Sequence, residues 1–169
     1  GASADGTINS YYIPSKAFDG DYGTWWVGEI GRNEWDLYYG FTSVRHIDRI
    51  GINFYSTSHT PAQVQLKTSA DGANWTTVGD FAAGSANPWL TVNDDIRYIW
   101  IQMDGNPSVN YPLIRDVTWL PEPDREGALA GPGVNDYHYK AANAFDGDSN
   151  TWWVGEVGAG SWEMYYKFS

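Results

Sequence analysis

A short acidic segment, KAFDGDYGTWW at residues 16–26, holds the residues whose types and spacing are best suited to chemistry. Asp19 and Asp21 flank Gly20, and Thr24 follows three residues after the second aspartate. A tight loop with this spacing brings carboxylate, hydroxyl and carbonyl oxygens toward one point, and calcium binds six to eight oxygens at about 2.3–2.6 Å in flexible geometry. The segment therefore predicts a calcium loop, with a solvated Asp-Gly turn as the alternative.

Nearly the same segment occurs twice, as AFDGDYGTWWVGE at 17–29 and as AFDGDSNTWWVGE at 144–156. The two copies keep a constant offset of 127 residues. Solenoid repeats have periods of roughly 20–50 residues, so this period indicates a tandem array of whole domains. A segment rich in Pro, Gly and charge separates the copies. The sequence predicts a complete domain at 1–121, a linker at 122–133 and the opening third of a second repeat at 134–169.

Composition and charge narrow the classes of partner. The chain has 169 residues, 42% of them hydrophobic, which is enough for a packed core. Its 21 acidic and 10 basic residues give a net charge of −11, which disfavours nucleic acids and anionic lipid surfaces, and membrane insertion is not expected. GASADGTINS lacks the layout of a signal peptide, so Gly1 is expected to begin a mature chain or fragment. With no cysteine, disulfides and thiol chemistry are excluded.

Alternating patterns place the acidic loop in an all-β domain. Half-buried strands are predicted at 47–55 and 62–68, where apolar and hydrophilic residues alternate. Asp71-Gly72 predicts a tight hairpin turn after the second of these strands. Two further strands are predicted at 97–103 and 116–120, which are rich in branched and aromatic residues. Because helical periodicity is absent and Gly and Pro punctuate the strands, the pattern favours an antiparallel sandwich or jelly roll.

The order of these blocks resembles one known family. KAFDGDYGTWW, DLYYGF, IDRIGINFY, VQLKTSADGANWTTV, RYIWIQ and LIRDV follow one another as in the discoidin family, which comprises the coagulation-factor (F5/8) type C domains and the family 32 carbohydrate-binding modules. The resemblance covers most of residues 9–121. It implies an eight-stranded antiparallel jelly-roll β-sandwich whose two termini lie close together.

The resemblance also implies a ligand set for the calcium. In these modules the acidic loop commonly holds a structural calcium ion. Asp116 stands where the family usually has Glu, so its carboxylate has a shorter reach. In the second copy Asn143, Asp146, Asp148 and Thr151 match, but the closing acid is missing, so that copy is expected to bind calcium weakly or not at all. The implied ligands are the carbonyl of Lys16, the carboxylate of Asp19, the carbonyl of Asp21, the carbonyl and hydroxyl of Thr24, the carbonyl of Arg115 and the carboxylate of Asp116.

The tryptophans divide into two groups. Adjacent residues of a strand point to opposite faces, so Trp25 and Trp26 cannot both lie in the core. In the family the second position is usually buried, which makes Trp26 and Trp153 structural and leaves Trp25 free. Trp100 lies between inward Ile99 and Ile101 and is expected to face outward, as a sugar platform, a protein contact or an ordinary exposed aromatic.

A sugar site is expected in loops at one end of the sandwich, as in the carbohydrate-binding relatives. The corresponding loops are 27–35, 55–62 and 104–112. They combine a planar ring with hydrogen-bond donors and acceptors, which is chemically sufficient for a sugar. His59 stands where sugar binders usually place Arg, and His46 is expected to be a strand residue with no chemical role. The candidate carbohydrate-binding residues are Glu29, Arg32, Asn33, His59, Asn110 and Tyr111.

Two functions remain open. The first is a non-catalytic, calcium-stabilised carbohydrate-binding or adhesion module, repeated for avidity in a surface or secreted protein. The second is a structural repeat of an extracellular fibre or surface array. An enzyme is not expected, because the chain has no cysteine, no Gly-x-Ser-x-Gly elbow and no His-rich metal motif. The expected partners are a glycan or neighbouring copies of the chain. Since two opening segments share one domain body, contacts between repeats or between chains are expected.

Overall fold

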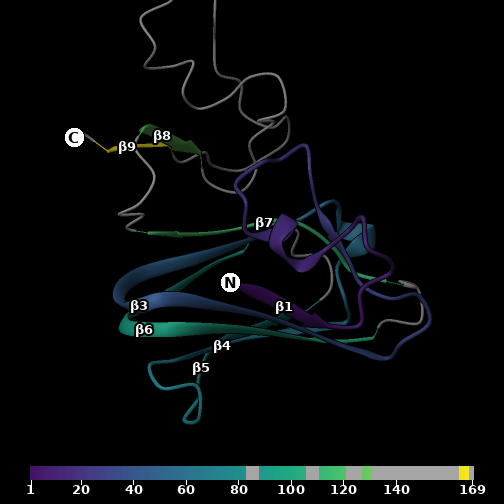
Figure 1. Ribbon diagram of the computed structural model, residues 1–169, viewed down its shortest axis with the longest axis horizontal. Coiled ribbons are helices and arrows are strands. Elements are labelled where there is room, and N and C mark those ends of the chain that lie inside the picture. The colour runs from purple at the N-terminus through teal and green to yellow at the C-terminus, as the bar shows by residue number, and fades with distance from the viewer. Residues whose placement is uncertain (83–87, 106–110, 121–126, 131–163, 168–169) are drawn as a thin grey trace, which may run out of the picture. The chain divides into compact units, whose positions relative to one another are not determined.

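The first compact unit of the chain, Gly1–Pro121, is built from antiparallel strands (Figure 1). The computed structural model describes residues 1–82, 88–105, 111–120, 127–130 and 164–167. Two short 3₁₀ turns, η1 (Pro14–Ala17) and η2 (Thr57–His59), lie beside the strands. The strands of this unit are β1 (Ala2–Asp5), β2 (Trp26–Val27), β3 (Glu34–Phe54), β4 (Gln63–Ser69), β5 (Thr76–Ala82), β6 (Trp89–Asp104) and β7 (Leu113–Leu120).

Two long strands, β3 and β6, build both layers of the sandwich. The hydrogen-bonded order is β2-β7-β3-β6-β4-β5, with β1 on the other side of the first half of β3. That first half pairs with the second half of β6, and after a register shift between Gly40 and Arg45 the second half pairs with the beginning of β6 and with β7. Because each long strand bends from one layer into the other, the hydrogen-bond ladder stays continuous. The predicted all-β jelly roll is confirmed.

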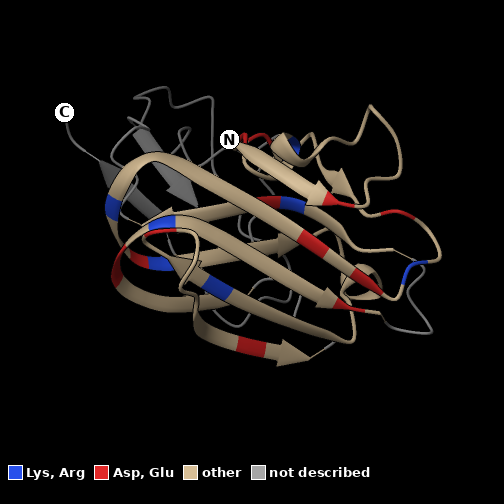
Figure 2. Ribbon diagram, turned by 60° about the horizontal axis from the view of Figure 1, so that its bottom comes forward, with Lys and Arg blue, Asp and Glu red and all other residues tan. Residues whose placement is uncertain are grey.

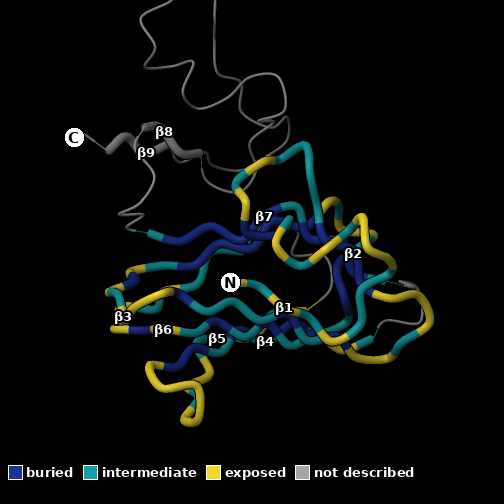
Figure 3. Tube along the Cα trace, in the orientation of Figure 1, coloured by how far each residue is buried: buried dark blue, intermediate teal, exposed yellow. Residues whose placement is uncertain are grey.

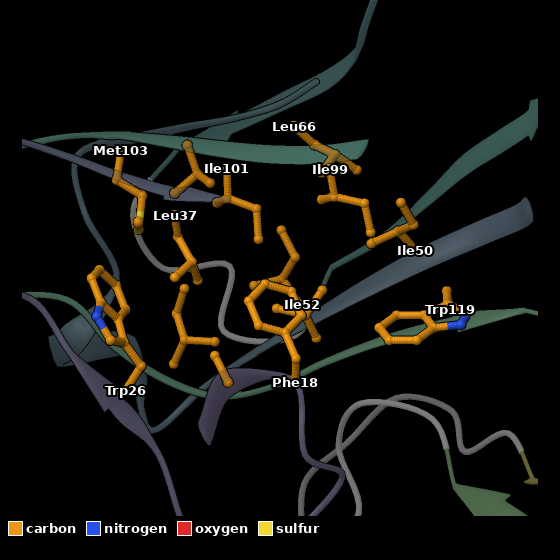
Figure 4. Packing of buried hydrophobic residues seen from close by; sticks show 14 of the residues in the cluster. Phe18, Trp26, Leu37, Ile50, Ile52, Leu66, Ile99, Ile101, Met103 and Trp119 are labelled. Atoms are coloured by element: carbon orange, nitrogen blue, oxygen red, sulfur yellow. The ribbon is translucent and has the colours of Figure 1, made fainter. Parts of the chain in front are cut away.

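The core lies between the two layers. Residues of β3, β6 and β4 alternate between the core and the outer face, so Leu37, Ile101 and Leu66 are fully buried (Figure 3). Trp26 lies at one end of the drawn cluster and Trp119 at the other, with Phe18 between them (Figure 4). The strands predicted at 97–103 and 116–120 fall within β6 and β7, and those predicted at 47–55 and 62–68 match parts of β3 and β4 to within one residue. Burial of Trp26 confirms its predicted structural role, while Trp153 lies outside the described residues.

The second unit, Glu122–Ser169, contains the strands β8 (Gly127–Ala130) and β9 (Met164–Lys167), which pair antiparallel. Their register places Ala128 opposite Tyr166, and in the first unit Ala2 stands opposite Tyr39. GASA at 1–4 and GALA at 127–130 are thus paired in the same way to equivalent residues of the two copies. A strand therefore lies inside the range 122–133, which the sequence predicted to be a linker.

Among the described residues, no helix has the length and apolar character needed to cross a membrane.

Candidate functional site

The three loops predicted to form a sugar site meet at one end of the first unit (Figure 1). Gly28 donates its N–H to the carbonyl of Pro112 at 3.0 Å, which ties the first loop to the third. Gly105 donates to the carbonyl of Asn33, and Ala62 donates to the carbonyl of Asp104 at 3.1 Å. These backbone hydrogen bonds join segments that are far apart in the sequence. They therefore fix the relative positions of the loop backbones that carry the candidate side chains.

Aromatic rings form a continuous row that begins at this loop end. Each ring contacts the next, and each is at least partly exposed. We call this row the aromatic strip; it consists of Tyr11, Tyr12, Trp25, Tyr55, His59 and Tyr111.

Local structure explains why these rings face outward. Trp26 turns into the core, where its Nε1 donates to the Thr7 hydroxyl at 3.1 Å, so the preceding Trp25 must face the opposite way. Tyr55 follows the buried Phe54 at the end of β3 and is 44% exposed. The predicted freedom of Trp25 is thereby confirmed.

The predicted His59 and Tyr111 come together at the loop end, with ring centroids 5.7 Å apart. The η2 turn holds the imidazole, because His59 Nδ1 lies 2.8 Å from the Ser56 hydroxyl and 3.2 Å from that of Ser58. Tyr55 stands edge-on to His59 with a centroid separation of 5.6 Å. A sugar at this position would meet a ring face and an oriented imidazole nitrogen, the combination that sugar recognition requires.

The other predicted sugar-binding residues form a second, charged group at the same loop end. Arg32 contacts the Glu29 carboxylate at 3.2 Å and the Asp5 carboxylate at 3.3 Å, and its Nε donates to the Glu34 carbonyl. The Arg32 guanidinium is therefore largely held by the protein itself. Asn33 is exposed beside it, and Asn110 lies outside the described residues. Basic and acidic positions are interspersed over the strands and loops of the first unit (Figure 2).

Sequence reasoning missed three members of the strip, Tyr11, Tyr12 and Tyr55, and the side-chain role of Arg115. The Arg115 guanidinium lies 4.6 Å from the Tyr55 ring centroid, and its buried Nε has no hydrogen-bond partner among the described residues. Arg115 had been assigned only a backbone carbonyl. A tyrosine at the last position of a predicted strand, and a Tyr-Tyr pair just before the acidic loop, are the signals that point to the missing rings.

The acidic loop has the tight geometry that its spacing predicts. Asp19 accepts the Thr24 hydroxyl at 2.7 Å and the Asp21 N–H at 2.9 Å. The Asp21 carbonyl accepts the Thr24 N–H at 2.9 Å, and Gly20 adopts a φ of 71°, a conformation that favours glycine. Carboxylate, carbonyl and hydroxyl oxygens thus gather within one short turn.

Asp116 connects β7 to this loop. Its side chain is buried, and its Oδ1 accepts the Gly20 N–H at 3.3 Å while its Oδ2 accepts the Thr118 hydroxyl at 2.9 Å. Residues 96 positions apart are thus brought together, as the ligand set requires. In the described part of the chain no three Asp, Glu, His or Cys side chains cluster in a way that could hold a metal. The expected set has only two carboxylates, Asp19 and Asp116, and completes itself with carbonyls and a hydroxyl, so its hard oxygens fit calcium chemically.

Two other residues singled out in the sequence lie away from the strip. Trp100 faces outward as predicted, stacked on Tyr38 with centroids 5.5 Å apart, and its Nε1 donates to Asp36 at 2.6 Å. Burial, followed by Asp36 and Asp5, raises the pKa of Tyr38. His46 lies on β3 as predicted, with Nδ1 2.9 Å from Asp95.

Comparison with solved structures identifies the fold. Chitosan-binding module 1 of a chitosanase/glucanase from Paenibacillus sp. IK-5 superimposes with a TM-score of 0.64 at 19% identity, covering 70% of this chain and 92% of that one. Chitosan-binding module 2 of the same enzyme, in complex with chitotriose, gives 0.63 at 18% identity, covering 70% and 94%. CpGH89CBM32-4 from Clostridium perfringens, in complex with GlcNAc-α-1,4-galactose, gives 0.59 at 16% identity, covering 69% and 86%.

Comparison at the level of sequence gives the family. A search of curated proteins found no match. Residues 16–99 match a family model described as "F5_F8_type_C_2: NedA-like, galactose-binding domain". This match confirms the resemblance that the order of sequence blocks indicated. The first unit is therefore a discoidin-fold domain that carries, over residues 16–99, the sequence pattern of a coagulation-factor type C domain.

Proposed function

We propose that this chain is a non-catalytic carbohydrate-binding module whose glycan site lies at the loop end of the aromatic strip. The observation that carries this proposal is the cluster of Tyr55, His59 and Tyr111, three partly exposed rings supplied by two converging loops. An exposed ring stacks on the apolar face of a sugar, while neighbouring nitrogen and oxygen atoms bond its hydroxyls.

The comparisons support a glycan as the ligand class. Two of the solved neighbours named above are in complex with chitotriose and with GlcNAc-α-1,4-galactose, and the matching family model is described as galactose-binding. At the identities observed these neighbours are informative about the fold, so the sugar that this chain binds is to be found by experiment.

The arrangement of the adjacent pair Asp94-Asp95 favours binding over catalysis. Hydrolysis of a glycosidic bond uses two carboxyl groups placed about 5–9.5 Å apart across the substrate. Asp94 and Asp95 are adjacent on β6, and Asp94 accepts the N–H of Asp95 at 2.8 Å while Asp95 contacts His46. These acids are engaged with the protein itself.

A glycan array probed with the full chain tests the proposed function. We expect saturable binding to at least one glycan, and we expect Tyr111→Ala and His59→Ala to weaken it by roughly tenfold or more, because each removes a ring from the centre of the site. Trp75→Ala is the matched control, since Trp75 is a partly exposed ring that contacts Tyr38 and Trp100. If the folded chain binds no glycan, the structural-repeat function replaces this one.

We propose further that the acidic loop binds one structural calcium ion through Asp19, Thr24 and Asp116, with the carbonyls of Lys16, Asp21 and Arg115. A buried carboxylate from β7 facing a loop of hard oxygens supports this site. Calcium would link the loop to β7 and so stabilise the folded state.

Melting curves with and without calcium test this ion. At a calcium concentration about 100 times Kd, a site present only in the folded state raises Tm by roughly 5–10 °C. Asp116→Asn should abolish the calcium-dependent shift, while Asp80→Asn on β5 should keep it. An unchanged Tm on chelation would reject the calcium site.

Tandem copies would increase the avidity of such a module for a glycan surface, as expected of an extracellular or cell-surface protein. Self-contact between repeats or chains is the corresponding proposal for assembly. Light scattering of the full chain measures it, and a strictly monomeric chain with a protease-labile 128–169 segment would reject it.

A further inference from the structure

The aromatic strip continues well beyond the loop end used in the proposed function. From Trp25 it reaches Tyr12 and Tyr11, which belong to the segment before η1. The Asn9 side chain fixes this segment, because its Oδ1 accepts the N–H of Tyr11 at 2.8 Å and that of Tyr12 at 3.4 Å. The backbone that carries the outer rings, Tyr11 and Tyr12, is therefore held by an Asx-type turn.

The rings of the strip contact one another in turn but differ in orientation. Tyr12 and Trp25 are nearly parallel, with an interplanar angle of 19°, but their centroids are 6.2 Å apart. The next pairs along the row are inclined at 57°, 88° and 49°, so a ligand lying along the row would meet ring edges as well as ring faces. From Tyr12 through Trp25, Tyr55 and His59 to Tyr111, successive centroids are separated by 6.2, 5.9, 5.6 and 5.7 Å. One sugar ring, which is similar in size to one aromatic ring, cannot cover this row.

A cation lies at the outer end of the strip. The Lys16 ammonium is 3.6 Å from the Tyr11 ring centroid and 6.0 Å from that of Tyr12. Tyr11 is 67% exposed, so this ammonium lies at the surface beside the rings. An ammonium next to an aromatic face provides hydrogen-bond donors for sugar oxygens at a position that the loop-end site does not reach.

We infer that the strip binds a glycan chain of several sugar units along its length, with Tyr12 and Lys16 forming an outer subsite. This inference rests on the proposed function, because the chain must first bind a glycan at the loop end. The substrate class is then an extended oligosaccharide or polysaccharide segment, recognised along its backbone as well as at a terminal sugar.

Calorimetry with ladders of one to five sugar units tests the subsite on the full chain. The probes are oligosaccharides of β-1,4-galactose, β-1,4-glucosamine and α-1,4-galacturonic acid. In a ladder that binds, affinity should rise with length, and Tyr12→Ala should weaken the longest member roughly three- to tenfold while leaving the single sugar unchanged. Tyr12→Phe keeps the ring and should keep the affinity for the long probes.

The controls separate this inference from the function on which it rests. His59→Ala should weaken short and long probes alike, and Trp75→Ala should change neither. If single sugars and pentamers bind equally, or if Tyr12→Ala weakens every probe equally, the outer subsite is wrong while the loop-end site stands. If no probe and no arrayed glycan binds the folded chain, the proposed function and this inference fail together.

Discussion

At the scale of single residues, Asp71 shows how one side chain fixes a turn. Its Oδ1 accepts the N–H groups of Ala73 and Asn74, both at 2.8 Å, and its Oδ2 accepts the Asn74 side-chain amide. Gly72 has a φ of 78°, which permits the tight connection between β4 and β5. Hydrogen bonds from Asn74 and then Ala73 hold the pKa of Asp71 well below its ordinary value.

This lowered pKa predicts a pH-dependent contribution of Asp71 to stability. Because the folded-state pKa lies below the unfolded value of 3.8, the contribution is present above that pH and is lost as the pH falls toward the folded value. We expect Asp71→Asn to lower the free energy of unfolding at neutral pH, and the gap from the parent chain to narrow below about pH 4. Urea unfolding at several pH values measures this difference in free energy of unfolding, with Asp80→Asn as the control. A difference that stays constant with pH would contradict the prediction.

Individual residues also show which features of the structure could be predicted from the sequence. The opposite orientations of Trp25 and Trp26 follow from strand alternation, and the hairpin at Asp71-Gly72 follows from turn chemistry. Tyr12 and Arg115 were missed as site residues because their place beside Trp25 and Tyr55 depends on contacts between distant segments. No local pattern encodes such contacts.

At the scale of elements, the two long strands, β3 and β6, explain why only part of the fold could be predicted from the sequence. Alternating apolar residues predicted the second half of β3, and branched and aromatic residues predicted the second half of β6. The sequence did not show that each strand bends from one layer into the other. The bend at the register shift between Gly40 and Arg45 depends on the pairing of β3 with β6, which is a tertiary contact.

The junction between the loops depends on a close approach at Gly28. A methyl group added there would lie 2.6 Å from Pro112 Cδ and 2.8 Å from Trp35 Cδ1. We expect Gly28→Ala to lower the free energy of unfolding by about 1–3 kcal/mol and to weaken glycan binding, because the first and third loops must separate.

Chemical denaturation and the glycan array together measure the effect of Gly28→Ala. Gly1→Ala is the control, since nothing lies within 4 Å of the methyl group that it adds. Unchanged stability and binding in Gly28→Ala would show that the loop junction tolerates the displacement.

At the scale of the whole molecule, the first unit has a core of its own. Every residue of the buried cluster lies between Ala17 and Trp119. We expect a chain ending at Pro121 to unfold in one cooperative transition, with a free energy in the range of about 5–15 kcal/mol that is usual for such domains. Circular dichroism during urea unfolding measures this, with the full chain as reference. An aggregated or non-cooperative product would show that the first unit needs the rest of the chain.

The pairing of β8 with β9 would affect the assembly of a protein that contained several such units. Its register, Ala128 opposite Tyr166, forms inside one repeat from segments of that repeat alone. Each newly synthesised copy has its own local partner for its first strand before the rest of its sheet exists. In a protein with several such units, strand exchange between neighbours would have to displace a pair that is already formed, and this would slow misassembly.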